Sequence, residues 1–403
     1  MKKRSYRSMK PVLGVDRRAF LKAAGTAAAA GAILGVPSFS EEELARKLPP
    51  KVETNIADFM KVPKGPHAIP GAFPGKVVQV TDAKSYVDGK VDSAVVMKMF
   101  DRGIAALTGK DPAKSFGFLF DKRDVVGIKV NPVGAPFISV TPALAEAVVG
   151  WLERGGIPRK NIIIWDRFDD MLKEAGFTQE SFPGVGIEAL QTMVEEGKSW
   201  KDKQGNHISA PNFDREAYYY AKGVVGTHVP GYKNDEEYQN QHVFAGEYSY
   251  FGKLVTKRLT KIVNLASFKN TGNGVSMATK NLGYGSICNT GRLHKPLFFR
   301  VCTEVLAAPW IRDKLVLNVT DGLRGQYDGG PMGNEQFLYP NRSLYFATDP
   351  FALDRTCHDE MVAKRKAMGV KVNEHPRFSD YLDYAQELGL GVADPAKIKR
   401  VQI

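Results

Sequence analysis

The stretch SFKNTGNGVSMATKNLGYG, residues 267–285, places two Lys-Asn pairs on either side of a glycine-rich run. The pairs are Lys269-Asn270 and Lys280-Asn281. Lysine ammonium groups attract anions, and a glycine-rich approach to a helix start leaves backbone N–H groups accessible to a negatively charged ligand. The stretch therefore predicts a binding site for a carboxylate or a phosphate.

The glycines do not form a known nucleotide-binding motif. The pattern G-x-x-x-x-G-K-[ST] is absent, and Met277 occupies the third glycine position of a G-x-G-x-x-G pattern that begins at Gly272. H-E-x-x-H and G-x-S-x-G are absent as well, which disfavours a zinc hydrolase and a nucleophile-elbow hydrolase.

Polar side chains follow five predicted strands, at the point where each strand ends. In parallel α/β sheets, ligands bind beside the carboxyl ends of the strands, so we expect these residues to converge on one rim. The alternative is that every strand ends where polar residues begin. The residues at the five ends are Lys129 and Asn131, Asp166 and Arg167, Ser267 with Lys269 and Asn270, Thr320 and Asp321, and Thr348 and Asp349.

Two roles follow from these residue types. Cations and amides suit an anion cradle, whereas a lysine beside carboxylates can stabilise developing negative charge and transfer a proton. The candidate catalytic residues are Lys269, Asp321 and Asp354. The candidate anion-binding residues are Lys129, Asn131, Asn270, Lys280, Asn281 and Arg292. Taken alone, Lys280 also fits a solvated lysine on a helix.

A metal ion is a further candidate cofactor, and the sequence leaves the cofactor's identity unknown. Asp166 and Asp349 could ligate a hard cation through carboxylate oxygens, although their spacing does not require it. Asp349 precedes Pro350, so it also fits a helix N-cap. The three cysteines form no C-x-x-C pair, and no cysteine motif for an iron–sulfur cluster is present.

Strand-like and helix-like segments alternate along most of the chain. This alternation predicts an α/β fold with a mainly parallel sheet flanked by helices, built from two halves. The predicted strands are 76–80, 124–130, 161–165, 260–266, 314–320 and 343–348. The predicted helices are 93–109, 141–156, 274–283, 298–310 and 349–369.

The domain organisation follows from changes in composition. We expect an export signal at 1–36, an extended Pro/Gly-rich arm at 37–75 and a single α/β domain at 76–403. Within that domain, 76–166 and 259–403 form the two halves. Between them, residues 167–258 read as a loop-rich, Tyr-rich insertion, which is either a lid or a surface elaboration.

The N-terminus predicts export. Arg17-Arg18 precede Phe20-Leu21-Lys22 and an Ala/Gly-rich run, a pattern that resembles a twin-arginine signal. The run is too short and too weakly apolar for a convincing membrane span. We therefore expect a periplasmic or extracytoplasmic protein that engages the twin-arginine translocase, tethered to the membrane if the signal stays uncleaved. The alternative is an Ala-rich amphipathic helix in a cytoplasmic protein.

The charge distribution argues against nucleic-acid binding. The net charge is +12, and residues 1–36 contribute +7 of it through eight Lys/Arg and one acidic residue. The remainder has no basic stripe and no basic clusters with interleaved aromatics, the usual features of nucleic-acid-binding proteins.

Several segments together resemble the domain-of-unknown-function family 362, in order across residues 76–392. They are VVGIKVNP, LASFKNTGNGVSMATKNLGYG with Arg292 and His294, LVLNVTDGLRGQYDGGP, ATDPFALD and YAQELGLG. Members often carry Lys-Thr-His where this chain has Lys269-Asn270-Thr271. Some also bear a ferredoxin-like four-iron cluster domain, whose cysteine motifs this chain lacks.

Two functional hypotheses remain open at this point. The first is an enzyme that acts on a small molecule with a carboxylate or phosphate, linked to redox chemistry if a cofactor is loaded before export. The second is a non-catalytic ligand carrier, or an accessory factor for an exported redox partner, with the Tyr-rich insertion as its partner surface.

Overall fold

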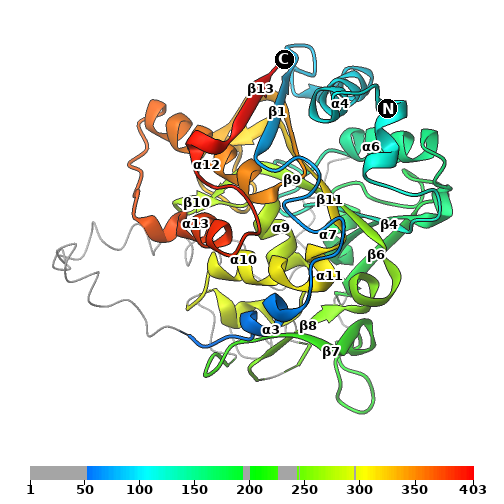
Figure 1. The fold of residues 1–403 in the computed structure, drawn as a ribbon, viewed down its shortest axis with the longest axis vertical. Coiled ribbons are helices and arrows are strands. Elements are labelled where there is room, and N and C mark those ends of the chain that lie inside the picture. The colour runs from blue at the N-terminus through cyan, green and yellow to red at the C-terminus, as the bar shows by residue number, and fades with distance from the viewer. Residues whose placement is uncertain (1–51, 194–199, 226–242, 245, 295) are drawn as a thin grey trace, which may run out of the picture.

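The computed structural model of the protein describes residues 52–193, 200–225, 243–244, 246–294 and 296–403. Its centre is a nine-stranded sheet in the order β13-β1-β12-β11-β9-β4-β5-β6, with β10 paired to β9 off this path (Figure 1). The strands are β1 (Lys76–Thr81), β4 (Val126–Lys129), β5 (Ile162–Phe168), β6 (Gly186–Gln191), β9 (Lys261–Thr271), β10 (Gly274–Val275), β11 (Leu315–Gln326), β12 (Leu338–Ala347) and β13 (Lys399–Gln402). The predicted signal at 1–36 lies outside the described residues.

Most of the sheet is parallel. Strands β6, β5, β4, β9 and β11 all run in one direction, and β1 pairs with β13 in parallel. Only β12 and the short β10 pair antiparallel to their neighbours. The prediction of an α/β fold with a mainly parallel sheet is confirmed.

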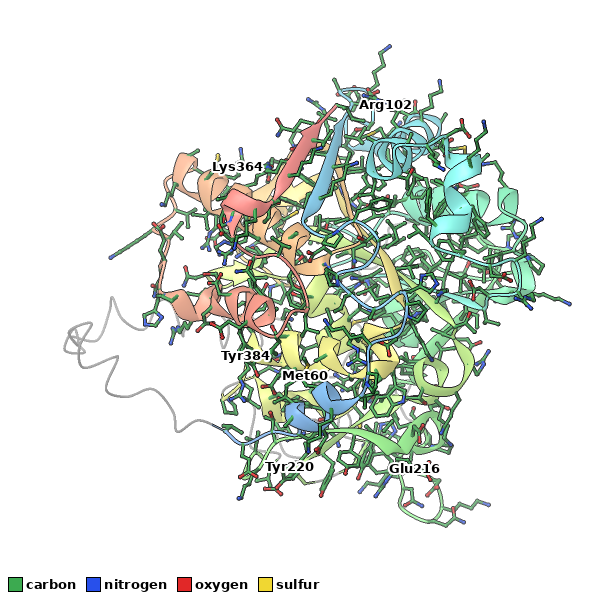
Figure 2. The ribbon with its side chains drawn as sticks, viewed as in Figure 1. Met60, Arg102, Glu216, Tyr220, Lys364 and Tyr384 are labelled. Atoms are coloured by element: carbon green, nitrogen blue, oxygen red, sulfur yellow. The ribbon has the colours of Figure 1, made fainter. Side chains whose placement is uncertain are left out.

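Helices cover both faces of the sheet. On one face, α4 and α6 pack against apolar side chains such as Val80 and Ile128. On the other, α9 and α10 pack around Trp165, and α12 packs around Phe268. Side chains fill both interfaces (Figure 2). The helices are α3 (Ile56–Lys61), α4 (Ser93–Thr108), α5 (Pro112–Ser115), α6 (Pro142–Arg154), α7 (Asp169–Glu174), α9 (Ala278–Gly285), α10 (Arg300–Ala307), α11 (Pro309–Arg312), α12 (Pro350–Ala367) and α13 (Asp380–Glu387).

The sequence defines several helix ends through side chains that cap them. The Asp92 carboxylate accepts hydrogen bonds from two N–H groups at the start of α4, and Gly109 ends that helix in the left-handed conformation. Thr141 caps α6, and Asp349 caps α12. In both helices proline occupies the first turn, where its missing N–H costs no hydrogen bond.

The region around the two Lys-Asn pairs differs from the prediction. Strand β9 continues to Thr271, so Lys269 and Asn270 lie within the strand rather than after it. Gly272 has a φ of +55°, which allows the chain to turn back into β10. Helix α9 therefore begins at Ala278, later than predicted.

The predicted helix at 298–310 is two helices. Pro309 has no N–H to continue α10, and the residue before a proline favours an extended backbone. Ala308 accordingly has φ −60° and ψ 134°, and α11 starts anew at Pro309.

The expected convergence of five strand ends is wrong for one strand. Because β12 is antiparallel, Ala347 pairs with Asn318 near the start of β11. Thr348 and Asp349 therefore lie at the opposite edge of the sheet from the carboxyl ends of β4, β5 and β9.

The segment 167–258 is more structured than the sequence pattern indicated. It contributes β6 to the edge of the main sheet. It also forms a two-stranded sheet of β7 (Phe213–Tyr220) and β8 (Tyr248–Gly252). The described part of the N-terminal arm contacts this small sheet, since the Asn55 side chain bonds the backbone of Tyr218 and Tyr220.

The cysteines are separate and buried. Cys288, Cys302 and Cys357 are all free thiols, and desolvation raises the pKa of each. Within the described ranges, no helix is long and apolar enough to cross a membrane.

Gly103 tests the packing of α4 on the sheet. A Cβ at this position would overlap the Phe346 ring of β12. We expect Gly103→Ala to lower the free energy of unfolding by about 1–3 kcal/mol, because overpacking outweighs the gain in helix propensity. Urea unfolding would measure this. Gly117→Ala is the control, since open space surrounds that position; equal stability of the two variants would contradict the packing described here.

Candidate functional site

Parallel strands bring Lys129, Asp166 and Lys269 to the same edge of the sheet. Strand β4 ends on Lys129, and it lies between β5, which carries Asp166, and β9, which carries Lys269. All three residues are buried, with 4% residue exposure or less. Ionisable groups are seldom buried in this way without partners, so their contacts decide what this edge can do.

Lys129 and Asp166 form a buried ion pair. The Lys129 Nζ donates to an Asp166 carboxylate oxygen, to Asn281 Oδ1 at 2.7 Å and to the Val130 carbonyl at 2.8 Å. All three ammonium hydrogens therefore have acceptors. Burial lowers the pKa of Lys129 and Asp166 raises it, and the fully satisfied geometry favours a charged lysine.

Buried asparagines continue this polar line across the sheet. Lys129, Asn264 and Asn318 are register partners on β4, β9 and β11. Asn264 Nδ2 donates to Asn318 Oδ1 at 2.9 Å, and Asn281 Nδ2 on α9 donates to Asn264 Oδ1 at 2.8 Å. Asn264 also donates to the Ala278 carbonyl at 2.9 Å. The line fixes α9 over the sheet and holds the cationic edge in place.

Lys269 is buried without a counter-charge. Its side chain has no exposed surface, and Nζ donates to Asn131 Oδ1 at 3.1 Å and to the Val133 carbonyl. Among the residues that the structure describes, no carboxylate lies within ion-pair distance of it. Desolvation, followed by the charge of Lys280, lowers the pKa of Lys269 well below 10.5, while the nearby charge of Asp166 raises it and that of Lys129 lowers it.

The contacts of Lys269 match a neutral amine. A neutral amine has two N–H donors and one lone pair, whereas an ammonium has three donors. Two acceptors face Nζ, so the neutral form satisfies both N–H groups and leaves its lone pair unused. A neutral lysine in a cationic environment is a base or a nucleophile.

Lys280 lies against aromatic rings. It is half-buried on α9, with Nζ 4.9 Å from the Tyr284 ring centroid and 5.8 Å from that of Phe298. Burial lowers its pKa. These contacts place Lys280 at an aromatic wall, so it is not a solvated helix lysine.

His294 packs against the same aromatic rings as Lys280. Its ring centroid is 4.6 Å from that of Tyr284, and Nδ1 lies 2.9 Å from the Thr290 carbonyl. Desolvation, followed by the charge of Lys280, lowers the pKa of His294 to about 3. The imidazole is therefore neutral at neutral pH, and solvent reaches the residue next to Lys280.

Two arginines differ in their distance from this edge. Arg167 follows Asp166, is buried and donates to Thr290 Oγ1, and its charge also lowers the pKa of His294. Arg292 instead bonds the carbonyls of Val224 and Tyr219 and the Ser249 hydroxyl, which ties it to the β7–β8 region. Arg167 rather than Arg292 accompanies the lysines.

Three of the predicted acidic residues support helices and turns. Asp354 accepts from the N–H groups of Ala278 and Thr279 and from the Thr279 hydroxyl at 2.6–2.9 Å, so it caps α9. Asp321 accepts from the N–H and hydroxyl of Thr141, both at 2.8 Å, at the start of α6.

The third, Asp349, binds four backbone N–H groups, namely those of Gly75, Phe351, Ala352 and Val392. Of the two proposed metal ligands, Asp166 therefore pairs with Lys129. The carboxylate of Asp349 is already bonded to backbone N–H groups, at the edge of the sheet opposite Lys129. Within the described ranges, no group of three or more His, Cys, Asp or Glu side chains could hold a metal ion.

Asn270 holds a neighbouring loop. Its Oδ1 accepts from Gly330 N–H at 3.0 Å, and its Nδ2 donates to the Gly272 carbonyl at 3.0 Å. In the structure Lys129 bonds Asn281 and Lys269 bonds Asn131, whereas Asn270 bonds the backbone of Gly330 and Gly272. Asn264 and Asn318 were not among the predicted site residues, although each is a single asparagine inside an apolar strand, in KIVNLA and LVLNVT.

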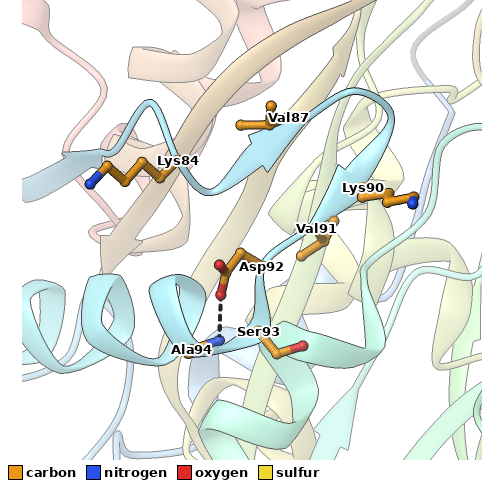
Figure 3. A pocket seen from close by; sticks show the side chains of 7 residues that line it. All are labelled: Lys84, Val87, Lys90, Val91, Asp92, Ser93 and Ala94. Atoms are coloured by element: carbon orange, nitrogen blue, oxygen red, sulfur yellow. Dashed lines mark hydrogen bonds between the residues drawn. The ribbon is translucent and has the colours of Figure 1, made fainter.

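A surface pocket of about 660 Å³ lies elsewhere, beside the β2–β3 hairpin (Tyr86–Val87 and Lys90–Val91) and the start of α4 (Figure 3). The Asp92 carboxylate in its wall already caps α4. The pocket brings together no catalytic combination of side chains, so the buried cationic edge is the better candidate.

Asp354 can be tested as a cap. We expect Asp354→Asn to lower the free energy of unfolding by about 1–3 kcal/mol, because an amide N–H₂ would face donors of α9. Asp359→Asn, on an exposed part of the same helix, is the control and should change it by less than about 0.5 kcal/mol. Unchanged urea stability in Asp354→Asn would reopen a catalytic role for this residue.

The charge state of Lys269 can be tested through pH. Because its pKa is lowered on folding, the unfolded chain binds more protons between that lowered pKa and 10.5, so stability rises with pH in this window. Lys269→Met should lack this rise, which amounts to at most about 1.4 kcal/mol per pH unit. The difference between the wild-type and Lys269→Met unfolding free energies, measured from neutral pH upward, reports it. A flat difference would show that Lys269 is charged.

A protein-family model matches most of the α/β domain. The family described as Domain of unknown function (DUF362) matches residues 126–359, which contain β4, β5, β9, β11, α9 and most of α12. Among curated proteins, none matches the sequence significantly. The matched range includes Lys129, Asp166, Lys269 and Lys280. The chain belongs to the DUF362 family.

Proposed function

We propose that the protein binds a small molecule carrying a carboxylate or a phosphate beside Lys269, Lys280 and Arg167, and that it acts on this molecule as an enzyme. The proposal depends on one observation, the buried Lys269 with no carboxylate partner among the described residues. Lys129 and Lys280 lie near Lys269, and within the described ranges the carboxylate close to these lysines is Asp166, which pairs with Lys129. A bound anion would supply the missing negative charge.

The chemistry follows from the neutral amine. An anion in direct contact with Nζ favours the charged form of Lys269, whereas an anion held by Lys280 leaves Nζ neutral and able to act as a base. In a reaction, the same Nζ can take a proton from the ligand, while Lys280 and Arg167 stabilise the negative charge that develops. His294 lies next to Lys280 and is exposed, which makes this side the natural approach for a ligand.

A carrier or accessory role is the second candidate function. The β7–β8 sheet carries exposed aromatic side chains, with Tyr218 at 36% and Tyr248 at 38% exposure. Such residues are enriched at protein interfaces. A partner that binds this sheet, such as an exported redox enzyme, would favour that role.

We also propose export through the twin-arginine translocase to the periplasm or another extracytoplasmic space. The support is Arg17-Arg18 with the Ala/Gly-rich run that follows. Replacing both arginines by lysine should retain the protein inside the cell, as fractionation would show. Unchanged export would contradict this route.

Calorimetry with phosphate, acetate and lactate tests the anion site. Titrations in two buffers of different ionisation enthalpy should show proton uptake on binding, because the pKa of Lys269 rises when an anion arrives. Lys280→Met should weaken binding by about tenfold or more, as expected for loss of a charge-assisted contact.

The matched control is Lys98→Met, which removes an exposed lysine of α4, on the opposite face of the sheet. It should leave affinity and proton uptake unchanged. Lys269→Met should abolish the proton uptake. The proposal would be overturned if neither Lys269→Met nor Lys280→Met changed the affinity, or if none of the three anions bound.

A further inference from the structure

The three lysines at the carboxyl edge of the sheet differ in the interaction partners of their Nζ atoms. The charge of Lys129 is paired with Asp166, and Lys280 lies over the rings of Tyr284 and Phe298. Lys269 has neither a carboxylate nor a ring as partner among the described residues, only two neutral oxygen acceptors. Its nitrogen is the one whose lone pair the fold leaves unused.

We propose that the anionic ligand also carries a carbonyl group, as a 2-oxo acid or an anionic aldehyde does, and that Lys269 Nζ condenses with that carbonyl to form an imine. This inference rests on the proposed anion site and names the substrate class that the site takes. A lysine that is desolvated and close to other cations is a known type of amine nucleophile.

The step balances with water as the only product besides the imine. The Nζ lone pair attacks the carbonyl carbon, and a C–N bond forms. The carbonyl oxygen then leaves as water with the two hydrogens that Nζ carried. One further proton from solvent converts the imine to an iminium, and no oxidant or reductant is needed. The carboxylate of the substrate lies beside Lys280 rather than on Nζ, so Nζ keeps its lone pair until it attacks. The carboxylate then offsets the positive charge of the iminium.

The hydrogen bonds of Nζ fit this change. An iminium keeps one N–H, so only one of the two present acceptors can retain its bond. Asn131 Oδ1 is the acceptor on a buried side chain, whereas the Val133 carbonyl belongs to the loop 132–138 that covers Nζ. Formation of the iminium therefore releases the bond to the loop and keeps the bond to Asn131.

Loop 132–138 is the part of the structure that must move to admit the carbonyl. Its backbone hydrogen bonds are mainly internal, such as Phe137 N–H to Gly134 O at 3.0 Å. Arg324 donates to Pro136 O at 3.3 Å, a contact at the exposed surface. Pro136 and Phe137 are exposed at the tip of the loop, whereas Pro132, Gly134, Ala135 and Ile138 are buried, so admission of the carbonyl displaces packed residues.

The test is reductive trapping of the full-length protein with pyruvate and sodium cyanoborohydride, followed by peptide mass mapping. The expected result is one secondary-amine adduct, located on Lys269. Lactate, which has the same carboxylate and a hydroxyl in place of the carbonyl, is the matched ligand control and should give no adduct. Lys98→Met should label as the wild type does.

A second variant keeps the test informative if Lys269→Met fails to fold. Asn131→Asp preserves the shape of the side chain and places a carboxylate on Lys269 Nζ, which favours the ammonium form. An adjacent opposite charge raises a lysine pKa by about 1–3 units, so trapping should slow by about tenfold or more. Faster or unchanged trapping would overturn the role of Lys269 as nucleophile.

The outcomes separate the two proposals. Pyruvate and lactate that both bind by calorimetry without any adduct would overturn the imine and leave the anion site standing. Adducts spread over surface lysines, or located on Lys280, would also overturn it. Absence of binding by either acid would overturn both proposals.

Discussion

A charged or polar group that leaves water for a protein interior must find hydrogen-bond partners, and a charge must also find a counter-charge. This requirement organises the polar side of the sheet. Asp166 and Asn281 satisfy Lys129, and Asn264 and Asn318 satisfy one another beneath α9. Lys269 differs from Lys129 in having acceptors but no ion pair among the described residues. A buried lysine with hydrogen-bond acceptors but no ion pair is a candidate for a functional site.

Much of the architecture could be predicted because the alternation of apolar runs and amphipathic helices is a local property. The ends of helices and strands were harder to predict, since they depend on contacts between residues distant in sequence. Strand β9 continues through Lys269 because β10 turns back to pair with it, and β11 continues past Asp321 because β12 pairs alongside. The residues of β12 do not reveal that it runs antiparallel to its neighbours. For this reason Asp349 was predicted at the carboxyl edge of the sheet, whereas it lies at the opposite edge.

The candidate site was predicted in outline for a similar reason. Lysine and asparagine at the ends of parallel strands converge wherever the strands are neighbours, and that placed Lys129, Asn131 and Lys269 together. Carboxylates were misjudged because an aspartate that caps a distant helix looks, in sequence, like one that faces a ligand. Asp354 binds N–H groups more than 70 residues away, at the start of α9. Asn264 and Asn318 were missed, although a single polar residue inside an apolar strand is a usable signal.

The burial of the three cysteines has a consequence for how the folded protein responds to oxidants and reductants. Each thiol is buried apart from the others, and its raised pKa keeps it protonated and unreactive. No covalent cross-link is needed to complete the fold, and no thiol is presented for oxidation. Once folded, the protein therefore shields all three thiols from oxidants, and its structure contains no disulfide bond that a reducing compartment could break.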